Sequence, residues 1–147
     1  MKATPVMPLS ERQKRLVRES FETVRGYDTA VVKLFYGRLF ELAPETRALF
    51  KIDIRKQSQK LLDTLATAVD ALDHFDQLLP TLGTLGKKHV AYGVKPPYYK
   101  TLRTAFLWAL GQALGMALDK ETREAWEQLL TNISTVMIDA AAEVEQA

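Results

Sequence analysis

Cysteine is absent from the 147 residues of this sequence. Its absence excludes disulfides, cysteine–zinc sites, iron–sulfur clusters, cysteine nucleophiles and pigments attached through thioether bonds. Histidine is also scarce, since His74 and His89 are the only two imidazoles in the sequence. Any metal chemistry that depends on nitrogen ligands must therefore use one of these two side chains.

Long apolar runs and a strong charge are missing too. No window approaches the roughly 18 apolar residues of a membrane-spanning helix, and the first residues lack the apolar core of a secretory signal. We therefore expect a cytoplasmic protein that does not enter a membrane. The formal net charge of +2 is too small to indicate a nucleic-acid partner.

The remaining composition is that of one ordinary globular domain. Hydrophobic residues make up 47% of the sequence and charged residues 26%, which leaves little room for disorder. The length matches a single domain, which we place at residues 1–147, with residues 1–8 as a flexible tail. No internal repeat divides the sequence.

Apolar residues recur every three or four positions along nearly the whole chain, which indicates helices. The first helix begins at Ser10, where Gln13 completes an S-x-x-Q capping box. Asp119 is placed to cap the last helix, and prolines and glycines separate the helices between them. No strand pattern appears. The sequence predicts an all-α domain of seven or eight helices, two of them short.

His89 is the residue that carries most information about function. It shares a helix face with Leu82 and Leu85, which lie seven and four residues earlier. A lone histidine on an apolar face is commonly a core residue, and the alternative is an axial ligand of haem iron. In the second case its Nδ1–H would donate to a carbonyl one turn back, near Leu85, which would fix the tautomer.

Tyr36 and Gln57 form a second candidate group. Each lies beside apolar positions of a predicted helix, where a buried hydroxyl or amide needs a hydrogen-bond partner. They are either an ordinary half-buried tyrosine and an exposed glutamine, or a pair that hydrogen-bonds a polar diatomic ligand. His74 lies between Asp73 and Asp76 and is interpreted as an exposed turn residue.

Several stretches together resemble a known family. They are LFYGRLFELAPETRALF at 34–50, Gln57 with Lys60 and Leu61, GKKHVAYGVKPPYY at 86–99, and Trp126. In this order and spacing they resemble a globin, and specifically a bacterial single-domain haemoglobin similar to the globin domain of flavohaemoglobins. The resemblance implies the three-over-three globin fold and a non-covalently bound haem b.

The resemblance also implies a role for each matching residue. His89 would be the proximal ligand of the haem iron, and Tyr36 and Gln57 would form the distal hydrogen-bonding pair. The other implied haem contacts are Phe50 as a stacking ring, Lys60 toward a propionate, Leu61 as the distal wall, and Leu85, Val94 and Leu102 on the proximal side.

Tyr99 corresponds to a tyrosine that, in this family, shares a hydrogen-bond network with the proximal histidine. The same network usually includes a carboxylate in the last helix, and alignment on Trp126 puts Ala141 at its position. Because residue 57 is Gln, this position cannot supply a second axial histidine to the haem iron. We therefore expect a sixth coordination site that is open or water-filled. Because Ala141 replaces the carboxylate, we also expect a weak electron push from His89.

The function implied is binding of O2 and other diatomic ligands, NO and CO, in a monomer or weak homodimer. The resemblance extends to nitric oxide detoxification or weak peroxidase activity, with electrons from an external reductase because no reductase pattern is present. The alternative is a redox or gas sensor, or an interaction module of globin shape with little or no turnover. A Soret band in the purified protein would separate a haem binder from a module without haem.

Overall fold

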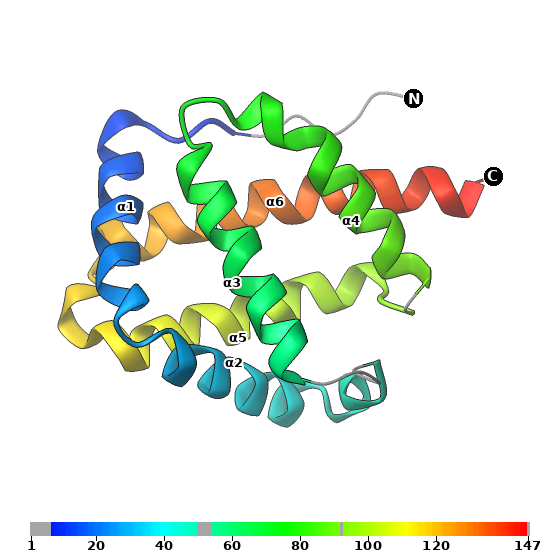
Figure 1. Cartoon of the computed structure of the whole chain (residues 1–147), viewed down its shortest axis with the longest axis horizontal. Coiled ribbons are helices and arrows are strands. Elements are labelled where there is room, and N and C mark those ends of the chain that lie inside the picture. The colour runs from blue at the N-terminus through cyan, green and yellow to red at the C-terminus, as the bar shows by residue number, and fades with distance from the viewer. Residues whose placement is uncertain (1–6, 50–53, 92, 147) are drawn as a thin grey trace.

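A computed structural model describes residues 7–49, 54–91 and 93–146 of the chain. These residues form six α-helices and three short 3-10 helices, without a strand among them (Figure 1). The α-helices are α1 (Glu11–Arg25), α2 (Asp28–Leu42), α3 (Ile54–Asp70), α4 (Leu79–Ala91), α5 (Pro96–Leu114) and α6 (Lys120–Gln146). The 3-10 helices are η1 (Pro44–Leu49), η2 (Phe75–Leu78) and η3 (Gly115–Ala117).

The predicted all-α class is confirmed, whereas the predicted number of seven or eight helices is wrong. The difference lies in the three short segments η1, η2 and η3, which form 3-10 turns rather than α-helical ones. Segments of three to six residues are too short for apolar periodicity to distinguish the two kinds of turn. In the described residues, no helix is long and apolar enough to cross a membrane.

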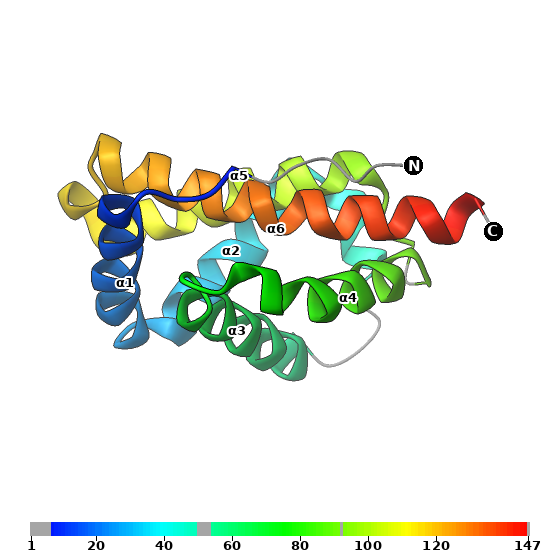
Figure 2. The same cartoon turned by 90° about the horizontal axis from the view of Figure 1, so that it is seen from above.

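The helices form two layers that cross each other. Figure 2 shows α3 and α4 on one side and α5 and α6 on the other, with α1 closing one end. Helix α4 packs mainly against α6, α2 against α5, and α1 against α6. Of the elements that carry the predicted functional residues, α2 is therefore supported by α5 and α4 by α6, whereas α3 contacts α1.

Trp126 of α6 lies at the centre of the larger core and is fully buried. Its ring centre lies 6.2 Å from that of Phe21 in α1 and 6.1 Å from that of Phe106 in α5. The indole Nε1 donates a 2.8 Å hydrogen bond to the hydroxyl of Ser20. A buried indole needs such an acceptor, so this contact fixes α1 and α6 in one register.

The first helix begins where the capping pattern predicts. The Ser10 hydroxyl accepts from the Gln13 backbone N–H at 3.1 Å, and the Gln13 side chain accepts from the Ser10 N–H at 2.9 Å. Just before it, the backbone of Met7 exchanges two hydrogen bonds with the side chain of Asn132. The expected flexible tail at 1–8 otherwise falls on residues outside the described ranges.

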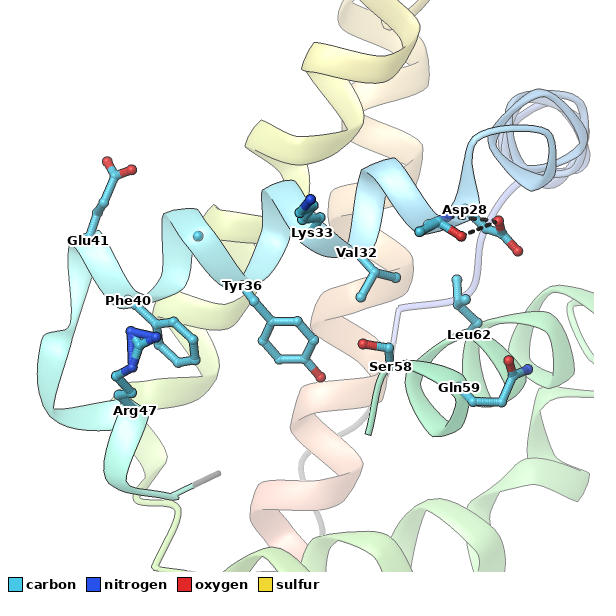
Figure 3. Close-up of a pocket in the computed structure, with 12 residues that line it drawn as sticks. Asp28, Val32, Lys33, Tyr36, Phe40, Glu41, Arg47, Ser58, Gln59 and Leu62 are labelled. Atoms are coloured by element: carbon cyan, nitrogen blue, oxygen red, sulfur yellow. Dashed lines mark hydrogen bonds between the residues drawn. The ribbon is translucent and has the colours of Figure 1, made fainter. Parts of the chain in front are cut away.

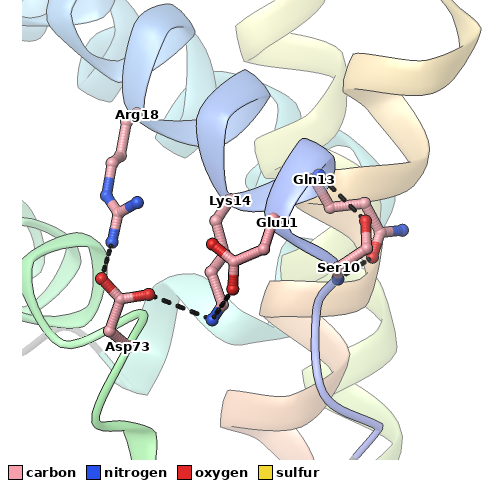
Figure 4. A network of polar contacts seen from close by, with 6 residues as sticks. All are labelled: Ser10, Glu11, Gln13, Lys14, Arg18 and Asp73. Carbon is pink, nitrogen blue, oxygen red and sulfur yellow. Dashed lines mark hydrogen bonds and ion pairs between the residues drawn. The ribbon is translucent and has the colours of Figure 1, made fainter.

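A polar network joins α1 to the turn that follows α3 (Figure 4). The Asp73 carboxylate accepts from Lys14 at 3.0 Å and from Arg18 at 2.9 Å, and Lys14 also reaches Glu11 at 3.1 Å. Hydrogen bonds from Lys14 and then Arg18 lower the pKa of Asp73. Exposed ion pairs of this kind contribute little stability individually, but together they connect α1 to the segment leading into α4.

Helices α4 and α6 approach each other at Gly86. A Cβ atom at this position would lie 2.8 Å from the Met137 Cα and 2.9 Å from its carbonyl carbon, closer than real Cβ contacts. One turn earlier, a Cβ at Gly83 would meet the Ala140 Cβ at 3.8 Å, which is ordinary contact. Because His89 lies three residues after Gly86, this crossing sets the position of the imidazole relative to α6.

Gly86→Ala is expected to force α4 away from α6. Overpacking of this kind costs roughly 1–3 kcal/mol of unfolding free energy, which urea denaturation measures. The matched control is Gly37→Ala in α2, where a Cβ would meet nothing within 4 Å. Alanine there is expected to be neutral or to stabilise by up to about 1 kcal/mol. Equal stability of the two variants would contradict the crossing described.

Candidate functional site

His89 lies in the last turn of α4 and is half-buried. Its Nδ1 lies 2.7 Å from the Leu85 carbonyl oxygen, which can only accept, so Nδ1 carries the proton. The predicted hydrogen bond to a carbonyl one turn back is therefore confirmed. Burial lowers the pKa of His89, and the bond to Leu85 only partly opposes this. The imidazole is consequently neutral at neutral pH, which is the state that binds a metal ion.

The chain turns sharply after His89. Gly93 has a positive φ of 89°, and the Val94 N–H donates to the His89 carbonyl at 2.9 Å. This is a common helix ending in which glycine supplies the left-handed residue. Leu85 and Val94 both pack on a small apolar cluster that includes Tyr99 and Leu82. Two of the three residues predicted to line the proximal side, Leu85 and Val94, thus pack in one cluster with Tyr99.

Tyr99 is buried, and its ring centre lies 6.3 Å from that of His89. Its hydroxyl has no hydrogen-bond partner within the described part of the chain. Burial raises the pKa of this phenol to about 12, so it keeps its proton. An unsatisfied buried hydroxyl costs roughly 1–3 kcal/mol. The described residues therefore leave this buried donor unsatisfied.

The residue at the expected carboxylate position in α6 is the buried Ala141. It follows Met137 by one helical turn, and Met137 belongs to the same apolar cluster as Tyr99. A methyl side chain offers no hydrogen-bond acceptor. The alanine that replaces the family's usual carboxylate and the unpartnered hydroxyl of Tyr99 therefore occur in the same region of the core.

Tyr36 lies on a different helix, on the buried face of α2. Its hydroxyl points toward α3 (Figure 3), and Ser58 of α3 lines the same pocket. Burial raises the pKa of Tyr36 to about 12, although the Ser58 side chain opposes the shift. The phenol is therefore a protonated hydrogen-bond donor throughout the physiological pH range.

A pocket of about 900 Å³ opens between α2 and α3 beside Tyr36. Its inner wall includes Val32 and Leu62, and its outer end includes Arg47 (Figure 3). The Arg47 guanidinium lies 5.0 Å from the centre of the Phe40 ring, which stacks on Tyr36 at 6.1 Å. A volume of this size is typical of small-molecule sites.

The structure pairs Tyr36 with Ser58, a residue that the sequence patterns did not single out. The α3 residues in the pocket wall are Ser58, Gln59 and Leu62, whereas Gln57 is half-buried and is not among them. The distal role of Gln57 stays a prediction. Ser58 lies in a polar run without periodic signal, and its one indication was its position a turn before Leu62.

The remaining predicted residues lie in different surroundings. Leu61 and Leu102 are half-buried against the larger core, and Lys60 is exposed on α3. Phe50 lies outside the described residues. His74 is exposed immediately before η2, as predicted for a turn residue. In the described residues, no group of three or more His, Asp or Glu side chains is arranged to hold a metal ion.

Comparison with known proteins places this geometry in a family. The globin family model matches residues 33–137. A flavohemoprotein of Halalkalibacterium halodurans is 28% identical over 133 residues, covering 88% of this chain and 32% of the relative. An uncharacterized globin-like protein of Aquifex aeolicus is 25% identical, covering 88% of this chain and 92% of the relative. The chain therefore spans about a third of the flavohemoprotein that it matches.

A solved structure agrees with the sequence comparison. An engineered carbene transferase, a variant named for a nitric oxide dioxygenase of Rhodothermus marinus, superposes with a TM-score of 0.85 and 25% identity. The superposition covers 94% of this chain and 96% of that one. The helical architecture, the half-buried histidine of α4 and the family match over residues 33–137 lead to one conclusion: the chain is a member of the globin family, a family of haem proteins.

Proposed function

We propose that the chain holds haem b non-covalently through His89 and binds O2, NO and CO on the opposite side of the haem. The observation that carries this proposal is the neutral His89 imidazole, which the 2.7 Å bond from Nδ1 to the Leu85 carbonyl orients within apolar surroundings. An imidazole held in this tautomer presents Nε2 as its basic nitrogen. When bound, the haem iron supplies reversible coordination of a diatomic gas.

The apolar residues around His89 support the same assignment. Leu85 and Val94, which pack on the apolar cluster of Tyr99, are proposed to limit the access of water to the imidazole, and Leu102 is proposed to extend this wall. Phe50 and Leu61 are proposed as distal apolar contacts, and Lys60 as a partner of a propionate. The exposed position of Lys60 on α3 leaves its ammonium group in contact with solvent, where a carboxylate edge can meet it.

Tyr36 is proposed as the principal donor to the gas ligand. Its phenol stays protonated because burial raises its pKa to about 12. A donor of this kind stabilises the polarised O2 ligand more than CO, which carries little charge. Gln57 is proposed as a second donor, and Ser58 as the residue that holds the phenol in position.

Nitric oxide consumption is the turnover that we propose for this site. Conversion of NO and O2 into nitrate takes up one electron, so each turnover requires one electron from a separate reductant. Purified protein in the O2-bound form should consume NO stoichiometrically, and repeated turnover should require an added electron donor. Failure to consume NO under these conditions would contradict the proposed dioxygenase activity but not the proposed gas binding.

His89→Ala is expected to weaken haem retention because it removes the proximal ligand. Loss of a partner that merely hydrogen-bonds a ligand costs roughly 10–100-fold in affinity, and loss of the ligand itself should cost more. Haem transfer to an apo-acceptor protein and the Soret band measure the change. The matched control His74→Ala removes an exposed imidazole and should change neither. An unchanged band and affinity in His89→Ala would contradict the proximal assignment.

Tyr36→Phe is expected to speed O2 release by about two- to tenfold, because one net hydrogen bond is worth roughly 0.5–1.5 kcal/mol. CO release should change less, since CO is a weaker acceptor. Gln57→Leu should show a smaller effect, and the double variant should be non-additive if both donors reach one ligand. Stopped-flow release of the two gases measures these differences.

The control for this series is Tyr27→Phe, which alters an exposed tyrosine with 59% of its surface accessible. It should leave both release rates unchanged. Equal acceleration of O2 and CO release in Tyr36→Phe would show that the phenol acts through packing rather than hydrogen bonding.

Ala141→Glu is expected to raise a low peroxidase activity, because a carboxylate near Tyr99 supplies the acceptor that its hydroxyl lacks. Through Tyr99 it would also increase the electron donation of His89. The gain should be several-fold and should disappear when Tyr99→Phe is added. The control Ala142→Glu places the carboxylate about 100° further around α6, and thermal melting checks that both variants fold. High wild-type peroxidase activity, unaffected by Ala141→Glu, would show that the missing carboxylate is irrelevant.

A further inference from the structure

The acidic residues of the chain are absent from one continuous stretch. Between Asp76 and Asp119 there are 42 residues without Asp or Glu, and they contain five basic residues. The basic residues are Lys87, Lys88, Lys95, Lys100 and Arg103. The rest of the chain has 15 Lys and Arg against 18 Asp and Glu. The positive net charge of the protein therefore comes from this stretch alone.

These five residues gather at one end of the molecule. They occupy the end of α4, the connection that follows it and the beginning of α5, which meet at the right-hand end of the view in Figure 1. We name residues 87–103 the α4–α5 corner. Its four lysines are exposed, and so are Pro96 and Pro97 between them. The corner thus exposes two apolar prolines that lie in sequence between Lys95 and Lys100.

The cations of the corner are almost unpaired within the described residues. One acidic group from a packed neighbour approaches them, where the Glu143 carboxylate of α6 lies 4.0 Å from the Lys87 ammonium. Both side chains are more than half exposed, so the pair contributes little. Lys88, Lys95, Lys100 and Arg103 form no ion pair in the part of the chain that the structure describes. Their charge is available to a partner.

The corner also contains the helix turn that holds His89. Lys88 is its immediate neighbour, and the turn at Gly93 leads from His89 directly to Lys95. A protein that docks on these lysines would contact the segment that carries the proposed iron ligand. Electrostatic complementarity of this kind steers association and can raise its rate by roughly 10–1000-fold.

We propose that the α4–α5 corner is the docking surface for an acidic electron-transfer protein that supplies electrons to the haem site. This inference rests on the proposed function, in which each NO consumed requires one electron. In the docked complex the donor is oxidised by one electron and the ferric site is reduced by one, without a bond being formed or broken. A protein partner fits better than a nucleic acid. Among the corner's residues that the structure describes, Tyr98 is half-buried and Tyr99 is buried, so neither ring is exposed for base stacking.

The test uses a bacterial flavodoxin, a small acidic flavin protein, and the full haem-loaded chain. The variant Lys88→Gln/Lys95→Gln/Lys100→Gln removes three charges from the corner. The matched control Arg15→Gln/Lys120→Gln/Arg123→Gln removes three exposed charges from α1 and the start of α6, at the other end of the molecule (Figure 1). Fluorescence anisotropy of labelled flavodoxin gives the Kd for each protein, and thermal melting checks that both variants fold.

At low ionic strength the wild type and the control should bind flavodoxin equally well, and the corner variant at least about tenfold more weakly. The difference should vanish in about 1 M salt, where the screening length falls to about 3 Å. The proposal is wrong if the wild type does not bind at low salt, if both variants weaken equally, or if salt has no effect. It is also wrong if the corner variant loses affinity for a single-stranded oligonucleotide or an anionic vesicle but not for flavodoxin.

A second measurement separates docking from haem chemistry. Reduction of the ferric protein by dithionite, which needs no docking surface, should be the same in all three proteins. Reduction by reduced flavodoxin should be slower in the corner variant alone, by the same factor as its binding. Absence of a Soret band in the wild type would contradict the proposed function, whereas the anisotropy measurement on the same chain would still decide whether the corner binds the acidic protein.

Discussion

Helices α4 and α6 meet at Gly86 and Met137, where the two backbones lie too close for any side chain beyond hydrogen. The rest of the candidate site depends on this contact. It fixes the axis of α4 against the longest helix of the chain, and it does so one turn before His89. The Trp126 cluster anchors the other half of α6 to α1 and α5. The imidazole is therefore positioned by a rigid scaffold rather than by a loop.

Burial then determines the chemistry of the three aromatic polar groups. His89 is neutral, and Tyr36 and Tyr99 keep their protons to about pH 12, because in each case desolvation penalises the charged form. The difference among them lies in their partners. His89 has the Leu85 carbonyl and Tyr36 has Ser58, whereas the Tyr99 hydroxyl has no partner among the described residues. The donors with a partner lie on α2 and α4, and the unsatisfied donor lies on α5.

The distribution of charge on the surface does not depend on the packing of the core. The acids that could neutralise the α4–α5 corner are confined to other segments, and Asp73, for example, is engaged with Lys14 and Arg18 on α1. Repulsion among exposed lysines costs little in water, so the fold tolerates the concentration of positive charge beside His89. This separation allows the surface to be adapted to a partner without changing the buried site.

The sequence by itself determined the features that depend on neighbours along the chain. The helical periodicity, the Ser10–Gln13 capping box and the bond from His89 to Leu85 involve residues within one helical turn, so spacing alone predicts them. Only the tertiary structure decided that Ser58 meets Tyr36, that Gly86 meets Met137 and that the Tyr99 hydroxyl lacks a partner. These features join residues on different helices, or require all surroundings of an atom to be known. The relative placement of helices depends on the packing of the whole core, which no local pattern encodes.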